Sequence, residues 1–237
     1  MSSLNQQKDS QACRWHAFDS ALELERAAVA EILSAAQRAI AARGAFHIVL
    51  AGGTTPRRVY ETLRGAATEW RAWHVYYGDE RCLPIGHAER NSRMAAQAWL
   101  DHVAIPAAQV HPIPAEAGAS VAAEKYARLV NGIALFDLVL LGLGEDGHTA
   151  SLFPGHDTGE ALDAPSTLAV LDAPKPPPQR VSLSARRLSD ARQVIFLVTG
   201  NGKAQAVANW RSGKKIPAAL VAPQNGADVY VERSLLD

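Results

Sequence analysis

The stretch that most constrains the fold runs from Phe136 to Pro154 and reads FDLVLLGLGEDGHTASLFP. Its first part, Phe136 to Leu141, is a nearly continuous apolar run, which is typical of a strand buried on both faces of a parallel sheet. Three glycines follow within six residues (Gly142, Gly144 and Gly147), and glycines at the end of a strand let the backbone turn tightly and approach a ligand. Ligands of open α/β sheets bind beyond the carboxyl ends of the strands. We therefore expect a functional site at this turn.

Along the rest of the chain, short apolar segments alternate with amphipathic or Ala-rich ones. Strands are expected at 14–18, 46–50, 75–77, 136–141, 168–171, 181–183, 194–198 and 229–231, and helices at 20–42, 56–63, 92–100, 120–130 and 203–210. This alternation predicts βαβ units in an α/β fold, with a mostly parallel, Rossmann-like sheet and helices on both faces, in three α/β/α layers. We expect residues 1–237 to form a single domain, with 1–12 as a flexible N-terminal tail.

Overall charge and composition exclude several classes of protein. Lys plus Arg and Asp plus Glu number 24 each, so no global field attracts nucleic acid or an acidic membrane. No apolar run approaches the roughly 18 residues of a membrane helix. The two cysteines form no disulfide framework or metal-ligand spacing, and Met1 to Gln11 is polar, unlike a signal peptide. These features predict a cytoplasmic protein, either a monomer or a small homo-oligomer.

Charge is nevertheless divided unevenly along the chain. Residues 135–172 contain seven acids and no Lys or Arg, whereas 173–215 contain nine bases and one acid. Either the two segments lie on different solvated faces, or the second supplies cations for an anionic ligand while the first supplies reacting groups.

Two other interpretations of the glycine turn must be weighed. Its glycines match the dinucleotide fingerprint G-x-G-x-x-G, with Asp172 near the position of a ribose-binding acid. However, Glu145 and Asp146 would stand beside the pyrophosphate, and the prolines and glycines of 154–165 prevent a crossover helix of normal length. The turn could also be a tight loop with a surface histidine, His148.

Other strand ends carry groups suited to an anion. Gly52-Gly53-Thr54-Thr55 opens a helix directly after a strand, so free N–H groups and hydroxyls could hold a phosphate there. Asp79-Glu80-Arg81 follows another strand; it is either a solvated loop or, through Arg81, a bidentate phosphate contact. Lys203 lies in a Gly-rich turn, and Arg180 is a weaker candidate. The spacing of His148, His156 and nearby acids fits no metal site.

Together these motifs resemble those of the 6-phosphogluconolactonases. The matching segments are GGTTP at 52–56, DERCLP at 79–84 with Asn91-Ser92, GLGEDGHTASLFPG at 142–155, PKPPPQRVSLS at 174–184 and GNGK at 200–203. They span most of the chain, from about Arg14 to Val231. The related glucosamine-6-phosphate isomerases/deaminases carry a glutamate that assists ring opening where this chain has Phe153, so the lactonases are the better match.

The resemblance implies hydrolysis of 6-phospho-D-glucono-1,5-lactone to 6-phospho-D-gluconate in the oxidative branch of the pentose phosphate pathway, without metal or cofactor. We hypothesise that His148 is the general base on water and that Asp146 orients it. Backbone N–H groups at Gly144 and Gly147 would meet the oxyanion. The phosphate would be bound by residues 52–55, Arg81 and Lys203, with Arg180 as a further candidate. The alternatives are a glucosamine-6-phosphate deaminase/isomerase and a non-catalytic sensor of sugar phosphates.

Overall fold

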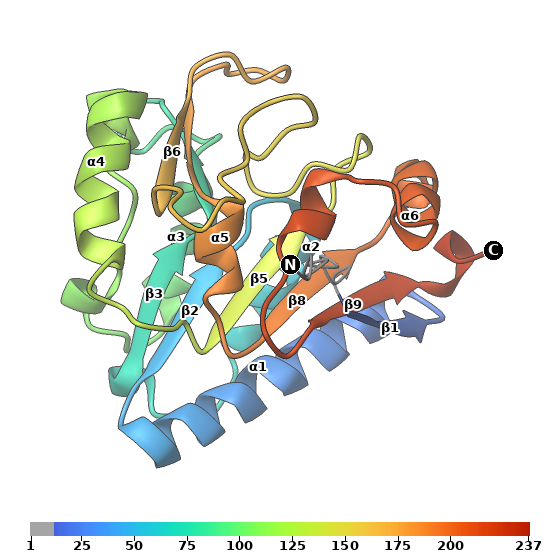
Figure 1. The fold of residues 1–237 in the computed structure, drawn as a ribbon. Coiled ribbons are helices and arrows are strands. Elements are labelled where there is room, and N and C mark those ends of the chain that lie inside the picture. Colours follow the sequence, from blue (N-terminus) through green and yellow to red (C-terminus); the bar gives the residue numbers. More distant parts are fainter. Residues whose placement is uncertain (1–11) are drawn as a thin grey trace, which may run out of the picture.

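The computed structural model describes residues 12–237 of the chain (Figure 1). The tail expected at 1–12 therefore lies outside the described residues, except for Ala12, whose carbonyl accepts a hydrogen bond of 2.9 Å from the Ala227 N–H. No helix in this part of the chain is long and apolar enough to cross a membrane.

The central layer is one sheet of six strands. Every neighbouring pair is parallel, which confirms the mostly parallel sheet predicted from the sequence. In order across the sheet, the strands are β1 (Cys13–Phe18), β9 (Ala227–Glu232), β8 (Val194–Val198), β5 (Leu138–Gly142), β2 (Phe46–Leu50) and β3 (Trp73–Tyr77). Because all of them point the same way, the loops that follow β2, β3, β5 and β8 leave from one edge.

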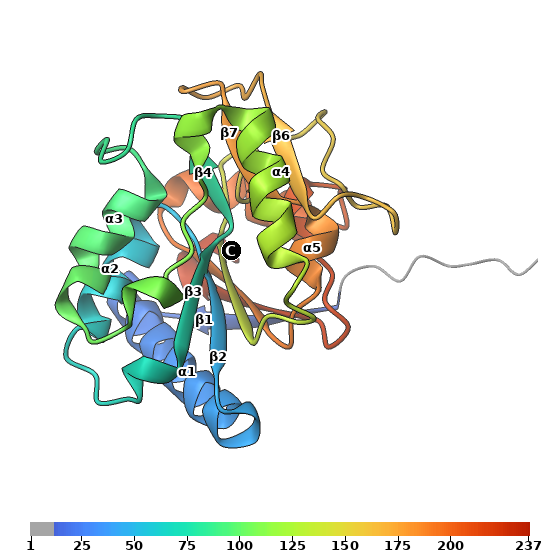
Figure 2. The ribbon, with the colours of Figure 1, turned by 90° about the vertical axis from the view of Figure 1, so that its left-hand side faces the viewer.

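Helices cover both faces of this sheet. The α-helices are α1 (Ala21–Arg43), α2 (Thr54–Leu63), α3 (Asn91–Ala98), α4 (Ala119–Val130), α5 (Ala185–Ser189) and α6 (Ala204–Arg211). Figure 2 looks onto the β3 edge and shows α1, α2 and α3 on one side, with α4 and α5 on the other. As predicted, Ser20 and Gly44 cap α1. Ser20 Oγ accepts a 3.3 Å bond from the Glu23 N–H at the start of the helix, and Gly44 has a left-handed φ of 75° after its last residue.

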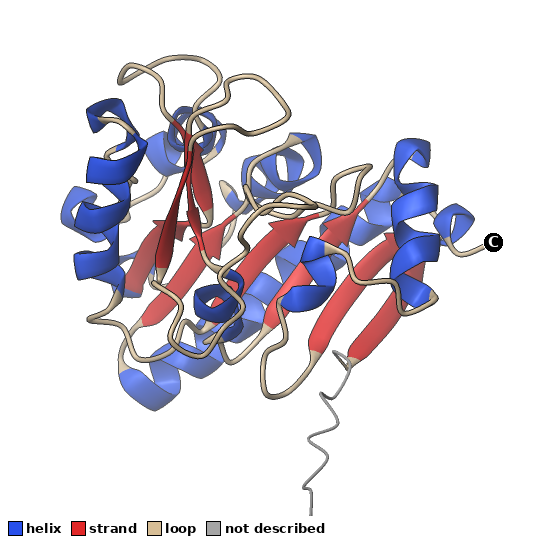
Figure 3. Cartoon of the chain, turned by 45° about the horizontal axis from the view of Figure 1, so that its top comes forward, coloured by secondary structure: helices blue, strands red, loops and turns tan. Residues whose placement is uncertain are grey.

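A second, antiparallel sheet stands beside the end of the main sheet (Figure 3). It consists of β4 (Asp79–Arg81), β7 (Arg180–Leu183) and β6 (Thr167–Val170). The interpretation of 79–81 as a solvated loop was therefore wrong. Glu80 is fully buried because its carboxylate caps α3, accepting bonds from Asn91 N (2.7 Å) and Ser92 N (2.8 Å).

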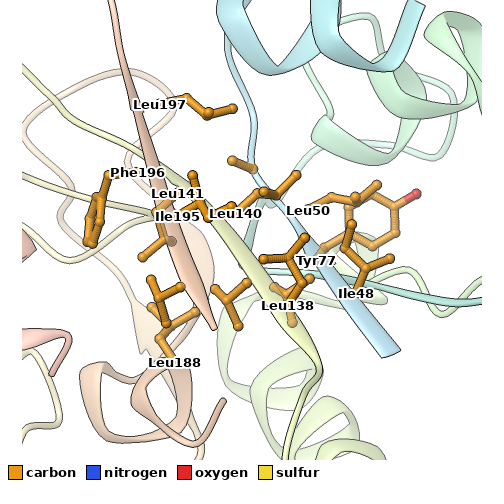
Figure 4. Packing of buried hydrophobic residues seen from close by; sticks show 14 of the residues in the cluster. Ile48, Leu50, Tyr77, Leu138, Leu140, Leu141, Leu188, Ile195, Phe196 and Leu197 are labelled. Carbon is orange, nitrogen blue, oxygen red and sulfur yellow. The ribbon is translucent and has the colours of Figure 1, made fainter. Parts of the chain in front are cut away.

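The core lies where the central strands β2, β5 and β8 meet the helices (Figure 4). Ile48, Leu138, Leu140 and Ile195 are completely buried, which accounts for the apolar runs seen in the sequence. Such close-packed strands are rigid. They hold the loops at their carboxyl ends in fixed relative positions.

Candidate active site

A cavity of about 210 Å³ lies at the carboxyl edge of the main sheet. Loops after β2, β3, β5 and β8 line it, together with β4 and β7 of the second sheet. Of the residues predicted from sequence, its lining includes Gly52, Gly53, Arg81, Gly144, His148, Arg180 and Lys203. The remaining predicted residues, Thr54, Thr55, Asp146 and Gly147, lie outside that lining. As predicted, no helix follows the glycine turn before β6, which leaves no dinucleotide-binding crossover.

His148 and Asp146 are in direct contact. The imidazole Nδ1 lies 2.5 Å from Asp146 Oδ1, and the same carboxylate oxygen accepts a 3.2 Å bond from the His148 backbone N–H. A carboxylate at Nδ1 holds the proton there and leaves Nε2 with a free lone pair. The pair therefore has the geometry of an oriented general base, which the two-residue spacing alone could not establish.

The surroundings keep this imidazole neutral. Burial lowers the pKa of His148 below its ordinary value of 6.5, although the hydrogen bond and charge of Asp146 act in the opposite direction. Partial burial alone would raise the pKa of Asp146, but the hydrogen bonds and charge of His148 outweigh it and lower that pKa. At neutral pH the site thus holds an ionised carboxylate beside a neutral base.

These pKa shifts predict how activity depends on pH. A base that must be neutral loses activity as pH falls through its pKa, so we expect an acid limb below pH 6.5. Asp146→Asn removes the charge that raises the pKa of His148, so its acid limb is expected at still lower pH, together with slower turnover. A pH profile of kcat/KM for both proteins measures this. An acid limb that stays in place in Asp146→Asn would show that Asp146 does not act on the titrating group.

His148 is held between two neighbours. A Cβ built on Gly144 would lie only 1.9 Å from His148 Nδ1, so the imidazole occupies space that only glycine leaves open. On the other side, the fully buried ring of Phe153 packs against the imidazole with ring centroids 4.8 Å apart. The residue that takes the place of the isomerase glutamate is thus an apolar wall for the base.

The N–H groups of Gly144 and Gly147, which we expected to meet an oxyanion, form hydrogen bonds within the turn. Gly144 N donates to His148 O (2.7 Å), and Gly147 N donates to Gly144 O (3.0 Å), so both N–H groups close the loop itself. Gly147 has a left-handed φ of 86°, and a Cβ there would lie 2.8 Å from Ile216 Cβ. Both glycines therefore shape the turn that carries His148.

Cations face the same cavity. Arg81 and Arg180 stand opposite each other in the β4–β7 register, and within residues 12–237 no carboxylate lies within ion-pair distance of either one or of Lys203. Arg81 Nε is buried without a partner in the described part of the chain. Burial lowers the pKa of Arg180; the negative charge of Asp79 opposes this shift, and the positive charge of Arg81 adds to it. Two adjacent guanidinium groups that form no ion pair within residues 12–237 are suited to a bound anion.

The glycine loop after β2 forms another wall. Helix α2 begins after Gly53 with no side chain capping its first turn, which leaves N–H groups for a ligand at the helix N-terminus. Thr55 Oγ1 bonds to Thr199 Oγ1 (2.6 Å), which joins the start of α2 to the loop after β8. Thr54 is exposed.

Sequence reasoning missed a buried polar cluster in the wall of the cavity. The Asp79 carboxylate accepts bonds from Asn91 Nδ2 (2.9 Å) and Ser151 Oγ (2.6 Å), and the Asn91 amide packs against Gly52. These residues come from three distant segments. The motifs of the resemblance included Asp79, Asn91 and Ser151, but none of these motifs indicated that the three side chains meet. Within residues 12–237, no group of three or more His, Cys, Asp or Glu side chains is arranged to hold a metal ion.

The sequence and the fold are similar to those of known proteins. The sequence profile of the glucosamine-6-phosphate isomerases/6-phosphogluconolactonase matches residues 19–230. A 6-phosphogluconolactonase of Synechocystis is 39% identical over 214 residues, covering 85% of this chain and 87% of that protein. A probable chloroplastic 6-phosphogluconolactonase 3 of Oryza sativa is 38% identical over 211 residues; the match covers 79% of this chain but 64% of the rice protein's length. The solved structure of a 6-phosphogluconolactonase from Trypanosoma brucei superposes with a TM-score of 0.86 at 27% identity, covering 95% of this chain and 98% of that one.

Proposed function

Since the chain belongs to the glucosamine-6-phosphate isomerase/6-phosphogluconolactonase family, we propose that it hydrolyses 6-phospho-D-glucono-1,5-lactone to 6-phospho-D-gluconate, as in the oxidative branch of the pentose phosphate pathway. The observation that carries this proposal is the 2.5 Å contact between His148 and Asp146 at a cavity that Arg81 and Arg180 also line. Both guanidinium groups donate to backbone carbonyls, Arg180 to those of Lys175, Pro176 and Pro177, but within residues 12–237 neither forms an ion pair. The same cavity is thus lined by a group suited to proton transfer and by cations suited to an anion.

The reaction needs a base and a positioned water, because the lactone carbonyl is already electrophilic. His148 Nε2 takes a proton from the water as its oxygen attacks C1 and forms a tetrahedral intermediate. The imidazolium then gives that proton to the ring oxygen as the C1–O5 bond breaks, which leaves a carboxylic acid at C1. This acid releases the second proton of the water to solvent and becomes the carboxylate of the open-chain product. Asp146 remains ionised throughout and stabilises the transient imidazolium.

The phosphate serves to position the lactone. Arg81, Arg180 and Lys203 line the same cavity as His148, so a phosphate bound to them fixes the sugar ring relative to the base. This arrangement follows the division of charge along the sequence, since His148 and Asp146 come from the acidic segment and Arg180 and Lys203 from the basic one.

The two alternatives fit the site less well. An isomerase of this family uses an acid where Phe153 is fully buried against His148, and a buried phenyl ring cannot exchange protons. A sensor of sugar phosphates would not need the His148–Asp146 contact, which orients an imidazole that burial keeps neutral next to the ligand cavity.

The test is hydrolysis of freshly generated 6-phosphogluconolactone, with product read through a coupled NADP-dependent dehydrogenase and spontaneous hydrolysis subtracted. A chelator is present throughout. We expect wild-type protein to accelerate the reaction well above the spontaneous rate. No acceleration would reject the lactonase proposal, and conversion of glucosamine 6-phosphate by the same sample would support the isomerase instead.

The same assay tests phosphate recognition. Arg81→Gln should lower kcat/KM for the phosphorylated lactone by roughly 10- to 150-fold, the value of one or more hydrogen bonds to a charged group, chiefly through KM. Unphosphorylated gluconolactone should be affected little. Arg81 is suited to this test because, within residues 12–237, its side chain donates one hydrogen bond, to the Glu89 carbonyl, so the fold loses little. Arg128→Gln, an exposed position on α4, is the matched control. Equal losses for both lactones would show that Arg81 does not bind the phosphate.

A further inference from the structure

A second charged cavity lies at the opposite edge of the main sheet. Its volume is about 270 Å³, and it is bounded by α1 and by residues at the amino ends of β1, β9, β8 and β5. The catalytic cavity, in contrast, is lined by residues at the carboxyl ends of the strands. Figure 1 shows α1 running along this lower edge of the molecule. The charged residues of the lining are Arg14, Arg38, Arg43, Arg192, Asp137 and Asp228.

Two of the four arginines neutralise the two aspartates. Arg14 binds the Asp228 carboxylate through Nε (2.8 Å) and Nη2 (3.0 Å). Arg43 Nη2 lies 2.6 Å from Asp137 Oδ1, and Asp137 Oδ2 accepts a 2.8 Å bond from the His47 N–H. Both carboxylates are buried and have hydrogen-bond partners. They need no further cation.

The other two arginines are in excess of these pairs. Arg192 Nε approaches Asp137 only to 3.4 Å, and within residues 12–237 its side chain donates no hydrogen bond. Arg38 bonds to Ser34 (2.6 Å) and Glu31 (2.9 Å) on its own helix, and Glu31 is outside the cavity lining. A third, long bond of 3.5 Å joins Arg38 Nη2 to Gln193 Oε1 in the lining. Four arginines against two aspartates leave the lining with an excess of two positive charges, and counting Glu31 still leaves one.

The guanidinium groups also remain open to a ligand. The side chains of the four arginines are between 39% and 57% exposed, although each lines the cavity. A guanidinium carries five N–H donors in a fork that matches a phosphoryl group. The arginines of α1 and β1, together with Arg192 two residues before β8, line this one cavity. Such a site is suited to an anion with several negatively charged oxygens, each facing a different arginine.

We propose that this cavity binds a small polyanion bearing phosphoryl groups, at a site separate from the catalytic cavity. The ligand occupies the space between Arg38 and Arg192 and links the C-terminal half of α1 to the segment that precedes β8. Since it joins elements distant in sequence and binds only the folded chain, it raises the thermal stability of the protein. At 100 times its Kd, we expect a rise in Tm of roughly 5 °C.

The experiment measures binding of inorganic pyrophosphate at constant ionic strength, by calorimetry and by thermal unfolding. Arg38→Gln/Arg192→Gln is the central variant, since Arg14 and Arg43 still hold both buried aspartates and the fold is preserved. Arg81→Gln/Lys203→Gln removes cations of the catalytic cavity only. Arg26→Gln/Arg128→Gln, at two exposed positions, removes the same charge elsewhere.

We expect Arg81→Gln/Lys203→Gln to retain a pyrophosphate site that Arg38→Gln/Arg192→Gln loses, with Kd weakened at least tenfold and the rise in Tm abolished. The lactone hydrolysis rate without pyrophosphate should stay that of wild type in the Arg38/Arg192 variant, which confirms that it is folded. Arg192→Gln alone should also weaken pyrophosphate binding, by less than the double variant. Binding that survives in the Arg38/Arg192 variant, or that falls equally in the Arg26/Arg128 control, would overturn the proposal.

Discussion

His148→Ala is expected to slow lactone hydrolysis by roughly 100- to 10,000-fold, the range that a positioned general base contributes. The physical reason is the contact of Nδ1 with Asp146 at 2.5 Å, which leaves Nε2 free to take the proton of water. KM should change much less than kcat, because Arg81, Arg180 and Lys203, which we assign to the phosphate, are untouched.

His156→Ala is the matched control for this variant. His156 lies eight positions further along the same segment, and its ring also packs on Phe153, with centroids 6.1 Å apart. It pairs with exposed Asp172 rather than with Asp146. Turnover near wild type in His156→Ala, with a large loss in His148→Ala, would identify the base. Comparable turnover in His148→Ala and wild type would remove His148 from the mechanism.

Gly144→Ala should lose nearly as much activity although no reacting group is altered. The added Cβ would lie 1.9 Å from Nδ1 and 2.2 Å from Cε1 of His148, so the imidazole must move away from its position beside Asp146. We expect a loss of turnover of about 100-fold, with little change in the free energy of unfolding, because the clash is with a side chain at the cavity and not with the core.

The measurement is kcat and Tm of Gly144→Ala beside those of Gly65→Ala. A Cβ at Gly65 meets no atom within 4 Å, so this control reports the general effect of replacing a glycine. If Gly144→Ala hydrolyses the lactone at the wild-type rate, the position of the imidazole seen in the structure is not the one that catalysis requires.

Most of the main sheet could be predicted because its information is local. An apolar run such as 136–141 predicts a buried strand, and the capping residues Ser20 and Gly44 predict where α1 begins and ends. The pair Asp146 and His148 was equally visible, being two residues apart in one turn. Here sequence neighbours are also neighbours in space.

The second sheet and the polar cluster could not be predicted for the opposite reason. Strand β4 has three residues, all charged, and becomes a strand only because it pairs with β7, about one hundred positions away. Asp79 meets Ser151 across 72 positions. The hydrogen-bond partners of the Gly144 and Gly147 N–H groups depend on the conformation of the loop. No periodicity or composition reports such contacts.

The register of β4 against β7 also determines which changes of chain length the protein can accept. Arg81 faces Arg180 only because these two strands pair as they do. Side chains alternate between the two faces of a sheet, so inserting one residue within β7 would turn Arg180 away from the cavity. The connection that precedes β7 is constrained as well, because the carbonyls of Lys175, Pro176 and Pro177 accept hydrogen bonds from the Arg180 guanidinium. Relatives that keep the anion site are therefore expected to preserve the length of 175–183 and to differ in length only before it.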